Sequence, residues 1–415
     1  MSSPEYYCSN GLRFVRPYFH FFQTHVKSRW LGRTLLEVCA EDLHLRPEKI
    51  ESQVRDGKLY VISNQGRAAS TLEIKDWGIL KRRKLQRHDL VCHLKHTHEP
   101  AVLSNTSNDE PGASTEIVYQ DDNILVVNKP CGVPTHPSGS FRYNSMTEIL
   151  EHELKYKLYP CHRLDKSTSG ILIMAKNKEA AASFNQNRIT KKTYIARVRG
   201  KFPNSDDPIA VVAPIFTLNA AGGYLGQSNA NNLALNSKTL FQRLSYNAEQ
   251  DQSIVSCQPV TGRMHQIRIH LRNMGFPIVN DKHYNYLDYS GSTRDCNNLV
   301  LELYRRIKQI HPMINEFKDP EFNIDGTVDV YSATDFYSDV TLRSQISDLQ
   351  KLKLSELQEE GENDKEFCEE CGDYYRNSKQ SAEDQKIWLH SLRYKYQGDP
   401  DLIFETELPD WYNID

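Results

Sequence analysis

The chain has 415 residues, of which 39% are hydrophobic and 25% charged, the composition of a soluble globular protein with room for two or three domains. No apolar run approaches the length of a membrane span, and the N-terminus lacks the apolar core of a signal peptide, which excludes membrane-spanning and secreted proteins. The first residues are basic and aromatic but not cleanly amphipathic, so a mitochondrial presequence stays open. The nine scattered cysteines favour reduced thiols in the cytosol or nucleus over a disulfide framework.

The net charge of -3 conceals an uneven distribution along the chain. The first hundred residues are rich in Lys, Arg and His and include the run Lys81-Arg82-Arg83-Lys84, whereas residues 319–384 are strongly acidic. A basic region attracts a polyanion and an acidic one repels it. The distribution therefore points to nucleic acid as a partner.

Residues 30–103 are expected to form a small basic module after an N-terminal extension of residues 1–29. Amphipathic helices are predicted from residue 33 to 39 and from 47 to 54. Asp56-Gly57 is a turn signal before a strand at residues 58–62. A polar linker over residues 104–116 separates this module from the rest.

The main domain is expected over residues 117–400, with an acidic insertion at about 301–384 and a C-terminal tail at 401–415. Strands are predicted at residues 124–127, 193–198 and 253–257, and residues 201–250 read as long loops around weak strands. A helix should start at Ser145, where Ser145 and Glu148 form a capping-box pattern. Further helices are predicted at 179–187 and at 264–274, the latter ending at Gly275. This mixture predicts an α+β domain.

Nine residues, 162–170, combine two cations, a carboxylate and three hydroxyl-bearing side chains directly before the apolar run 171–175. Unpaired charges beside a core are costly, and Asp165 falls on a loop supported by a buried strand, which is where catalytic groups usually lie. A surface salt-bridge cluster at the mouth of a strand explains the same residues. The motif alone does not decide between these two interpretations.

Five motifs occur in order between residues 117 and 284, at 128–137, 162–170, 192–196, 261–270 and 275–281. In these motifs the chain resembles the RluA-type RNA pseudouridine synthases, and residues 388–394 resemble the last core segment of that family. Residues 30–98 resemble a diverged S4-type RNA-binding domain. The resemblance implies an α+β catalytic domain with a mixed, mostly antiparallel sheet and flanking helices.

The resemblance also implies a catalytic set. Isomerising uridine breaks the N1–C1′ bond, turns the uracil and rejoins it through C5, and Asp165 is the carboxylate that acts as nucleophile or base. Arg268 would keep that carboxylate ionised, although it could also be a helix-face charge in solvent. Tyr194 would stack on the base, although it could be an ordinary strand aromatic. The uracil stays bound throughout, so no cofactor is expected.

Further residues are assigned to substrate or RNA binding. Arg163 would fill the gap left by a flipped uridine, with a phosphate contact as the simpler alternative. His162 and Lys166 would support the loop or touch RNA, and Leu389 would pack beneath the base. The resemblance adds to this set the residues Thr168, Arg263, His265 and Gln266.

Cys368-Glu369-Glu370-Cys371 raises the question of zinc, but a structural zinc site normally needs four ligands. Cys131, Cys161 and His390 are not spaced as a second pair. The sequence analysis therefore expects no metal.

Residues 11–18, 388–394 and 404–411 resemble the tRNA-modifying members of the family and favour the uridine at position 31 of the anticodon stem, with position 32 as the alternative. The expected partner is tRNA, with no membrane and no small-molecule cofactor, and the chain is expected to be a monomer. Localisation is expected to be cytoplasmic, with a mitochondrial or nuclear share open. The competing hypotheses are an RNA-binding or chaperone protein without catalysis, and a DNA-binding protein, which the lack of a major-groove motif disfavours.

Overall fold

The structure, a computed structural model, divides into two compact units. The large unit comprises Met1–Val15, Pro100–Phe367 and Tyr374–Asp415, and the small unit comprises Arg16–Glu99 and Cys368–Asp373. The residues that the structure describes are 4–43, 45–63, 72–104, 115–186, 189–212, 215–216, 218–220, 223–225, 234–235, 237–285, 287–288, 344, 348, 365–376, 385–396 and 402–414.

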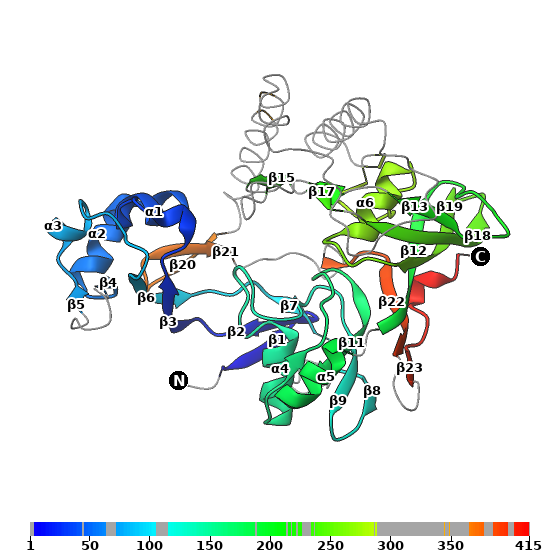
Figure 1. Ribbon diagram of the computed structural model, residues 1–415, viewed down its shortest axis with the longest axis horizontal. Helices are drawn as coiled ribbons and strands as arrows, with labels where there is room; N and C mark the ends of the chain where they lie inside the picture. Colours follow the sequence, from blue (N-terminus) through cyan, green and yellow to red (C-terminus); the bar gives the residue numbers. More distant parts are fainter. Residues whose placement is uncertain are drawn as a thin grey trace. The chain divides into compact units, whose positions relative to one another are not determined.

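The small unit is built on a four-stranded antiparallel sheet in the order β3-β6-β4-β5 (Figure 1). These strands are β3 (Tyr18–His25), β6 (Leu90–Thr97), β4 (Leu59–Ser63) and β5 (Leu72–Ile74). Helices α1 (Leu35–Glu41), α2 (Pro47–Arg55) and α3 (Trp77–Leu80), with the 3-10 turn η1 (Ser28–Trp30), complete the unit. The two predicted helices and the strand at residue 59 are confirmed, and Gly57 takes the positive φ of 68° that its turn needs.

One hydrophobic core holds the helices of the small unit to its sheet. Leu35 and Val38 of α1 and Ile50 of α2 pack with Leu59 and Val61, which share a face of β4 because alternate residues of a strand point the same way. Helix α1 starts with a complete capping box, in which Thr34 accepts from the Glu37 backbone and the Glu37 carboxylate accepts from the Thr34 backbone. The S4-like assignment of this unit stays a prediction.

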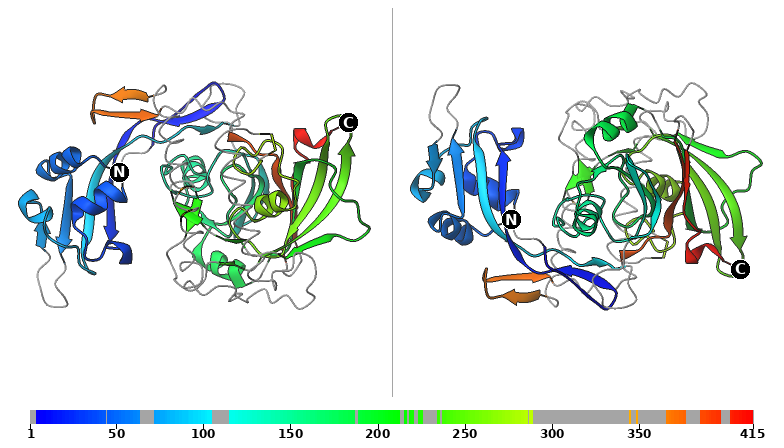
Figure 2. Two further views of the ribbon diagram at one scale, coloured as in Figure 1. Left: turned by 90° about the horizontal axis from the view of Figure 1, so that it is seen from above. Right: turned by 90° about the horizontal axis from the view of Figure 1, so that it is seen from below.

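The large unit is built on a ten-stranded sheet, whose long strands curve (Figure 2). Its main order is β13 (Ile209–Val212), β18 (Lys238–Asn247), β19 (Gln252–Pro259), β12 (Ile189–Arg199), β22 (Leu389–Tyr396), β11 (Ser169–Ala175), β9 (Ile124–Lys129) and β8 (Ile117–Gln120). Strand β10 (Tyr159–Pro160) pairs with β11, and β23 (Leu402–Glu405) pairs with β22. The pairings are antiparallel except for the parallel pair β11–β22, so the predicted α+β class with a mostly antiparallel sheet is confirmed.

Smaller elements complete the described part of the chain. A three-stranded sheet is formed by β1 (Tyr6–Ser9), β2 (Leu12–Val15) and β7 (Val102–Leu103). The two-stranded pairs are β14 (Ile215–Phe216) with β17 (Ala234–Leu235), β15 (Leu218–Ala220) with β16 (Gly223–Leu225), and β20 (Lys365–Cys368) with β21 (Asp373–Arg376). Among the described residues of the large unit, helices are formed by α4 (Met146–Leu154), α5 (Lys178–Gln186) and α6 (Gln266–Asn273), and a 3-10 turn by η3 (Asp410–Tyr412). Helix α5 packs on β11, and α6 packs on β18 and β19.

Several predicted details of the large unit are wrong. The Ser145 hydroxyl donates to the Arg142 carbonyl at 2.7 Å and does not cap α4, so the predicted capping box is absent. Residues 201–250 are not mainly loop, because the ten residues of β18 lie inside the main sheet. Helix α6 begins at Gln266, two residues later than predicted. Nearly all of the predicted acidic insertion lies outside the described residues.

Within the described part of the chain, every helix is too short or too polar to cross a membrane.

Candidate active site

The loop that carries Asp165 runs from β10 to β11 and is fixed by buried hydrogen bonds. The Thr135 hydroxyl donates to the Leu164 carbonyl at 2.9 Å and accepts from the Leu164 amide at 3.1 Å. The Lys129 ammonium donates to the carbonyls of Pro130 and Val133, both at 2.8 Å, and to that of Lys166 at 3.2 Å. The bonds to Leu164 and Lys166 tie the loop to the end of β9 and the chain that follows it, and the other two Lys129 bonds fix that chain. Asp165 is therefore presented by a rigid support, as the sequence motif led us to expect.

Gly170, the second residue of β11, lets the loop meet β22. It pairs with Ser391 in the parallel register and has a φ of 106°. A Cβ atom at this position would lie 2.2 Å from the Ser391 carbonyl oxygen, a distance that no side chain tolerates. The close approach of the two backbones therefore requires glycine here.

A pocket of about 420 Å³ opens next to this loop. It gathers all of the predicted site residues except Lys166, together with Lys192 of β12. Those residues are His162, Arg163, Asp165, Thr168, Tyr194, Arg263, His265, Gln266, Arg268 and Leu389. The Lys166 ammonium lies instead over the Phe141 ring, 4.9 Å from its centre. Segments more than two hundred residues apart thus converge on one cavity in the large unit.

Among the described residues, the Asp165 carboxylate forms an ion-pair contact with His265. Its Nε2 lies 3.8 Å from Asp165 Oδ2, and its Nδ1 lies 2.8 Å from the Tyr284 hydroxyl. Burial, then the charge of Arg268, lower the pKa of His265 to about 4, so the imidazole is neutral near pH 7. A neutral ring can accept from Tyr284 on one side and face Asp165 with its N–H on the other. His265 has a positive φ of 54° at the start of α6, which is uncommon outside glycine.

Arg268 was expected to be the nearby cation that keeps Asp165 ionised, and its guanidinium binds Asp281. Nε and one terminal nitrogen donate to the two Asp281 oxygens at 2.7 and 2.9 Å, and both side chains are buried. Burial alone would lower the pKa of Arg268, but the Asp281 carboxylate outweighs it and the pKa is raised; Asp165 adds a weaker attraction. Asp281 in turn has a lowered pKa because Arg268 outweighs its burial. Arg268 is therefore a fixed positive charge near Asp165, neutralised in part by a second carboxylate.

Tyr194 lies in β12 with 8% of its surface exposed, and its hydroxyl meets that of Tyr394. Burial raises the pKa of Tyr194 to about 12, so the phenol is protonated at neutral pH. Leu389 is in β22 next to β12, where it pairs with Ala196, and is also buried. Both side chains line the pocket, and their contact with a base stays a prediction.

Two predicted RNA-contacting residues use their polar atoms inside the protein. Gln266 accepts from the Thr261 hydroxyl and the Arg263 amide, and donates to Lys238 and Thr239 of β18. His162 accepts from the Ile173 amide of β11, and burial lowers its pKa to about 3. The geometry therefore gives Gln266 and His162 the task of holding the pocket wall.

Sequence reasoning missed several residues that build this site: Lys129, Thr135, Lys192, Asp281 and Tyr284. Lys129, Thr135, Lys192 and Asp281 stand inside the motifs already singled out at 128–137, 192–196 and 275–281. Two of them could have been noticed in the sequence: Lys129 comes shortly after a predicted buried strand, and Asp281 follows a predicted helix. Their partners, however, are set by the fold.

Comparisons with known proteins match the chain to one family of enzymes. A family model described as RNA pseudouridylate synthase matches residues 123–273. The tRNA pseudouridine(31) synthase of Saccharomyces cerevisiae is 31% identical over 444 residues, which cover 99% of this chain and 98% of that protein. The mitochondrial tRNA pseudouridine(32) synthase of the same yeast is 33% identical, over 68% of this chain and 57% of that protein.

Among solved structures, human RNA pseudouridylate synthase domain containing 4 is 20% identical with a TM-score of 0.39, covering 72% of this chain and 90% of that one. The first yeast relative exceeds 30% identity over nearly its whole length, and the family model covers every residue that lines the pocket except Leu389 of β22. The resemblance seen in the motifs is confirmed. The chain belongs to the RluA type of the RNA pseudouridylate synthase family of enzymes.

Proposed function

We propose that this enzyme converts uridine to pseudouridine in tRNA, at position 31 of the anticodon stem. The observation that carries the choice of position is the extent of similarity: the yeast protein named for position 31 is matched over 98% of its length. Position 32 is the second candidate, because the yeast protein named for it is 33% identical, though over only 57% of its length. Both uridines are near a helix–loop junction, where flipping a base costs less than in a continuous stem.

Asp165 is the proposed catalytic carboxylate. In one route its oxygen bonds to C1′ as the N1–C1′ bond breaks and the uracil leaves with the electron pair. In the other route it removes a ribose proton. The uracil that is released in either route turns in the pocket, and C5 bonds to C1′. The bond from Asp165 to C1′ breaks as this happens in the first route, and the abstracted proton returns to the ribose in the second. The C5 proton is then lost and N1 gains a proton, so the composition of the nucleoside is unchanged. The position of Asp165 at the pocket, on a loop held by Lys129 and Thr135, supports this role.

The surrounding residues favour the proposed chemistry. A leaving uracil carries negative charge, and Arg268 supplies a fixed positive charge on the same pocket wall. Tyr194 is a protonated phenol there, placed to stack on the base and to exchange a proton in the final step. Arg163 also lines the pocket and is the proposed filler of the space left by the flipped uridine.

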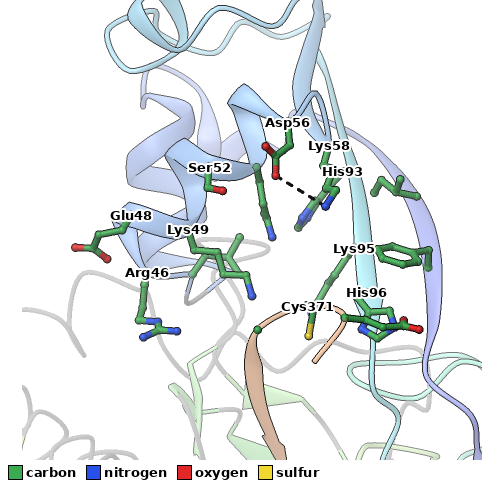
Figure 3. A pocket seen from close by; sticks show the side chains of 16 residues that line it. Arg46, Glu48, Lys49, Ser52, Asp56, Lys58, His93, Lys95, His96 and Cys371 are labelled. Carbon is green, nitrogen blue, oxygen red and sulfur yellow. Dashed lines mark ion pairs between the residues drawn. The ribbon is translucent and has the colours of Figure 1, made fainter. Parts of the chain in front are cut away.

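The small unit is the proposed RNA-binding module. It contains a pocket of about 580 Å³ whose lining includes four cations, Arg46, Lys49, Lys58 and Lys95 (Figure 3), and three carboxylates, Glu48, Asp56 and Glu370. The half-exposed ring of Phe19 also lines this pocket. Cations that face a cavity suit phosphates, and an exposed ring suits stacking on an unpaired base. The named relatives act on tRNA, one of them in mitochondria, so cytoplasmic or mitochondrial tRNA is the proposed substrate pool.

The test uses the purified full-length chain and tRNA transcripts in which one of the two uridines is replaced by cytidine. We expect pseudouridine to form when uridine 31 is present and not when only uridine 32 remains. The expected activity is lost with Asp165→Ala. Lys178→Gln, an exposed change on α5, is the control variant and should retain activity.

The two parts of the proposal fail in different ways. Modification of uridine 32 alone would contradict the position and leave the enzyme class intact. Full activity of Asp165→Ala would contradict the role of that carboxylate.

A further inference from the structure

The small unit brings together four side chains of the types that bind zinc. His96 is the seventh residue of β6, His98 follows that strand, and Cys368 and Cys371 come from the turn between β20 and β21. One ligand atom from each residue can be chosen so that all four atoms lie within 4.8 Å of one another. About 270 residues of sequence separate the two pairs (a separation of 272 for His96 and Cys368). We propose that these residues form a structural Zn²⁺ site with two thiolate and two imidazole ligands.

The distances between the pairs suit tetrahedral zinc. Bond lengths of roughly 2.3 Å for Zn–S and 2.05 Å for Zn–N at the tetrahedral angle place sulfur and nitrogen about 3.6 Å apart. Cys368 Sγ lies 3.6 Å from His96 Nδ1, and Cys371 Sγ lies 3.4 Å from His98 Nε2. These two separations match the ion, and the four ligand atoms can be chosen so that all the remaining separations are within 4.8 Å.

Each half of the site has a backbone that directs its two ligands the same way. His96 and His98 are two residues apart, so in an extended chain they point to one face. In the turn, the Gly372 amide donates to the Cys368 carbonyl at 2.9 Å, and Gly372 has a φ of 65°. That positive φ folds the chain back behind Cys371, and the two cysteines have the Cys-x-x-Cys spacing of zinc ligands.

A carboxylate supports one of the histidines. His96 turns Nδ1 to Cys368, and its Nε2 lies 2.8 Å from the Glu370 carboxylate. A histidine that binds a metal commonly donates its other N–H to a carboxylate, which fixes the tautomer and strengthens the ligand. The His96 side chain is 3% exposed and that of Glu370 is 68% exposed, so the carboxylate reaches the buried ring from the surface.

The ligand set also selects the metal and its role. Two soft thiolates and two imidazoles suit Zn²⁺, whereas Mg²⁺ and Ca²⁺ take oxygen ligands. Four protein ligands complete a tetrahedron and leave no position for a reactive water. The site is structural, and the reactive carboxylate Asp165 lies in the other unit. The expectation of no metal considered Cys131, Cys161 and His390 as the missing partners, and the fold supplies His96 and His98 instead.

The metal has a consequence for the basic pocket. Figure 3 shows Cys371 and His96 close together at one side of that pocket, with Arg46 and Lys49 from the start of α2 also on its wall. Glu370, Cys371 and Gly372 contribute the turn as part of the lining. Zinc would therefore fasten a distant piece of chain to β6 and complete a wall of the pocket that the proposed function assigns to RNA.

The test measures metal in the full-length protein by elemental mass spectrometry after purification with and without added Zn²⁺. We expect about one zinc per chain for the wild type, and loss of most of it in Cys371→Ser and in His98→Ala. His98→Cys should keep the metal, because a three-thiolate, one-imidazole set also binds zinc. The matched controls are His88→Ala, an exposed histidine of the same unit, and Cys8→Ser, and both should keep the metal.

Cobalt substitution gives a second readout that does not depend on activity or on yield. Co²⁺ in the wild type should show the visible bands of a tetrahedral ion and a thiolate-to-cobalt charge-transfer band that weakens in Cys371→Ser. A wild-type protein that binds neither Zn²⁺ nor Co²⁺ overturns the proposal. So does retention of the metal with the same spectrum by Cys371→Ser and His98→Ala, which would place it elsewhere.

Discussion

The two units of the chain hold distant segments together by different means. In the large unit the loop of Asp165 is fastened by a buried lysine and a buried threonine, and parallel pairing with β22 joins it to the C-terminal strands. In the small unit the turn Cys368–Asp373 meets β6 through side chains of metal-binding type. A reacting group needs a support that stays fixed through catalysis, and internal hydrogen bonds provide one. A binding surface can instead depend on an ion that assembles it.

The largest effect expected is on the rate of Asp165→Asn. The substitution keeps the size of the side chain but removes its charge, so neither attack on C1′ nor proton removal remains, and the turnover rate should fall by roughly 10³-fold or more. The dissociation constant for RNA should change by less than about threefold, since phosphate contacts dominate affinity. Single-turnover kinetics and filter binding measure the two quantities. A variant that keeps a tenth of the wild-type rate would show that another group carries the reaction.

Gly170→Ala tests the backbone contact that supports the catalytic loop. The added Cβ would meet the Ser391 carbonyl at 2.2 Å on a residue whose φ is already 106°, so the free energy of unfolding should drop by about 3 kcal/mol or more. Gly139→Ala is the matched control, because Gly139 also has a positive φ of 59° but no heavy atom within 4 Å of the added group. Gly139→Ala should lower the free energy of unfolding by about 1–2 kcal/mol. Equal losses in urea titrations would mean that the close approach to Ser391 is unimportant.

Acid should destabilise the large unit more than the small one. In the large unit, burial lowers the pKa of His162 to about 3 and the pKa values of His265 and His390 to about 4. Among the described residues of the small unit, burial lowers the pKa of His93 to about 4. Unfolded histidines bind protons below about pH 6.5, and these folded ones do not until about pH 4, so stability falls as the pH falls through that window. Between pH 7 and pH 5 each group contributes at most about 2 kcal/mol.

His390→Gln isolates one of these contributions. His390 lies between the hydroxyls of Ser169 and Thr406, at 2.8 and 2.6 Å, and glutamine retains hydrogen-bonding capacity without titrating. The unfolding free energy of this variant, measured in urea at pH 7 and pH 5, should decrease less over the interval than that of the wild type. His88→Gln, at an exposed position, should follow the wild type. An unchanged pH dependence in His390→Gln would argue that His390 titrates normally.

The sequence predicted the large unit's site better than the small unit's because of where the partners lie. The proposed catalytic residues Asp165, Tyr194 and Arg268 stand in contiguous motifs that the sequence alone reveals, and all three line one pocket. Their pairings were not found, because whether Arg268 meets Asp165 or Asp281 depends on how α6 packs. Likewise Cys368 and His96 are 272 residues apart, a distance over which no local pattern indicates contact. Strand β18 was missed because its apolar alternation is weak next to polar neighbours.

The smallest effects should come from the basic pocket of the small unit. Lys49→Gln and Lys95→Gln each remove one cation from its lining, so the dissociation constant for tRNA should rise severalfold per change and the salt dependence of binding should lessen by about one ion. The turnover rate at saturating tRNA should stay unchanged, because Asp165 and its loop are untouched. Lys81→Gln is the control, because it removes one cation that does not line the pocket. Lys81 belongs to the basic run of residues 81–84, where Arg83 is paired with Asp89. Fluorescence anisotropy at several salt concentrations measures the dissociation constant of all three variants. If Lys81→Gln weakened binding as much as the other two, RNA would respond to the overall charge of the unit, and the pocket would lose its assigned role.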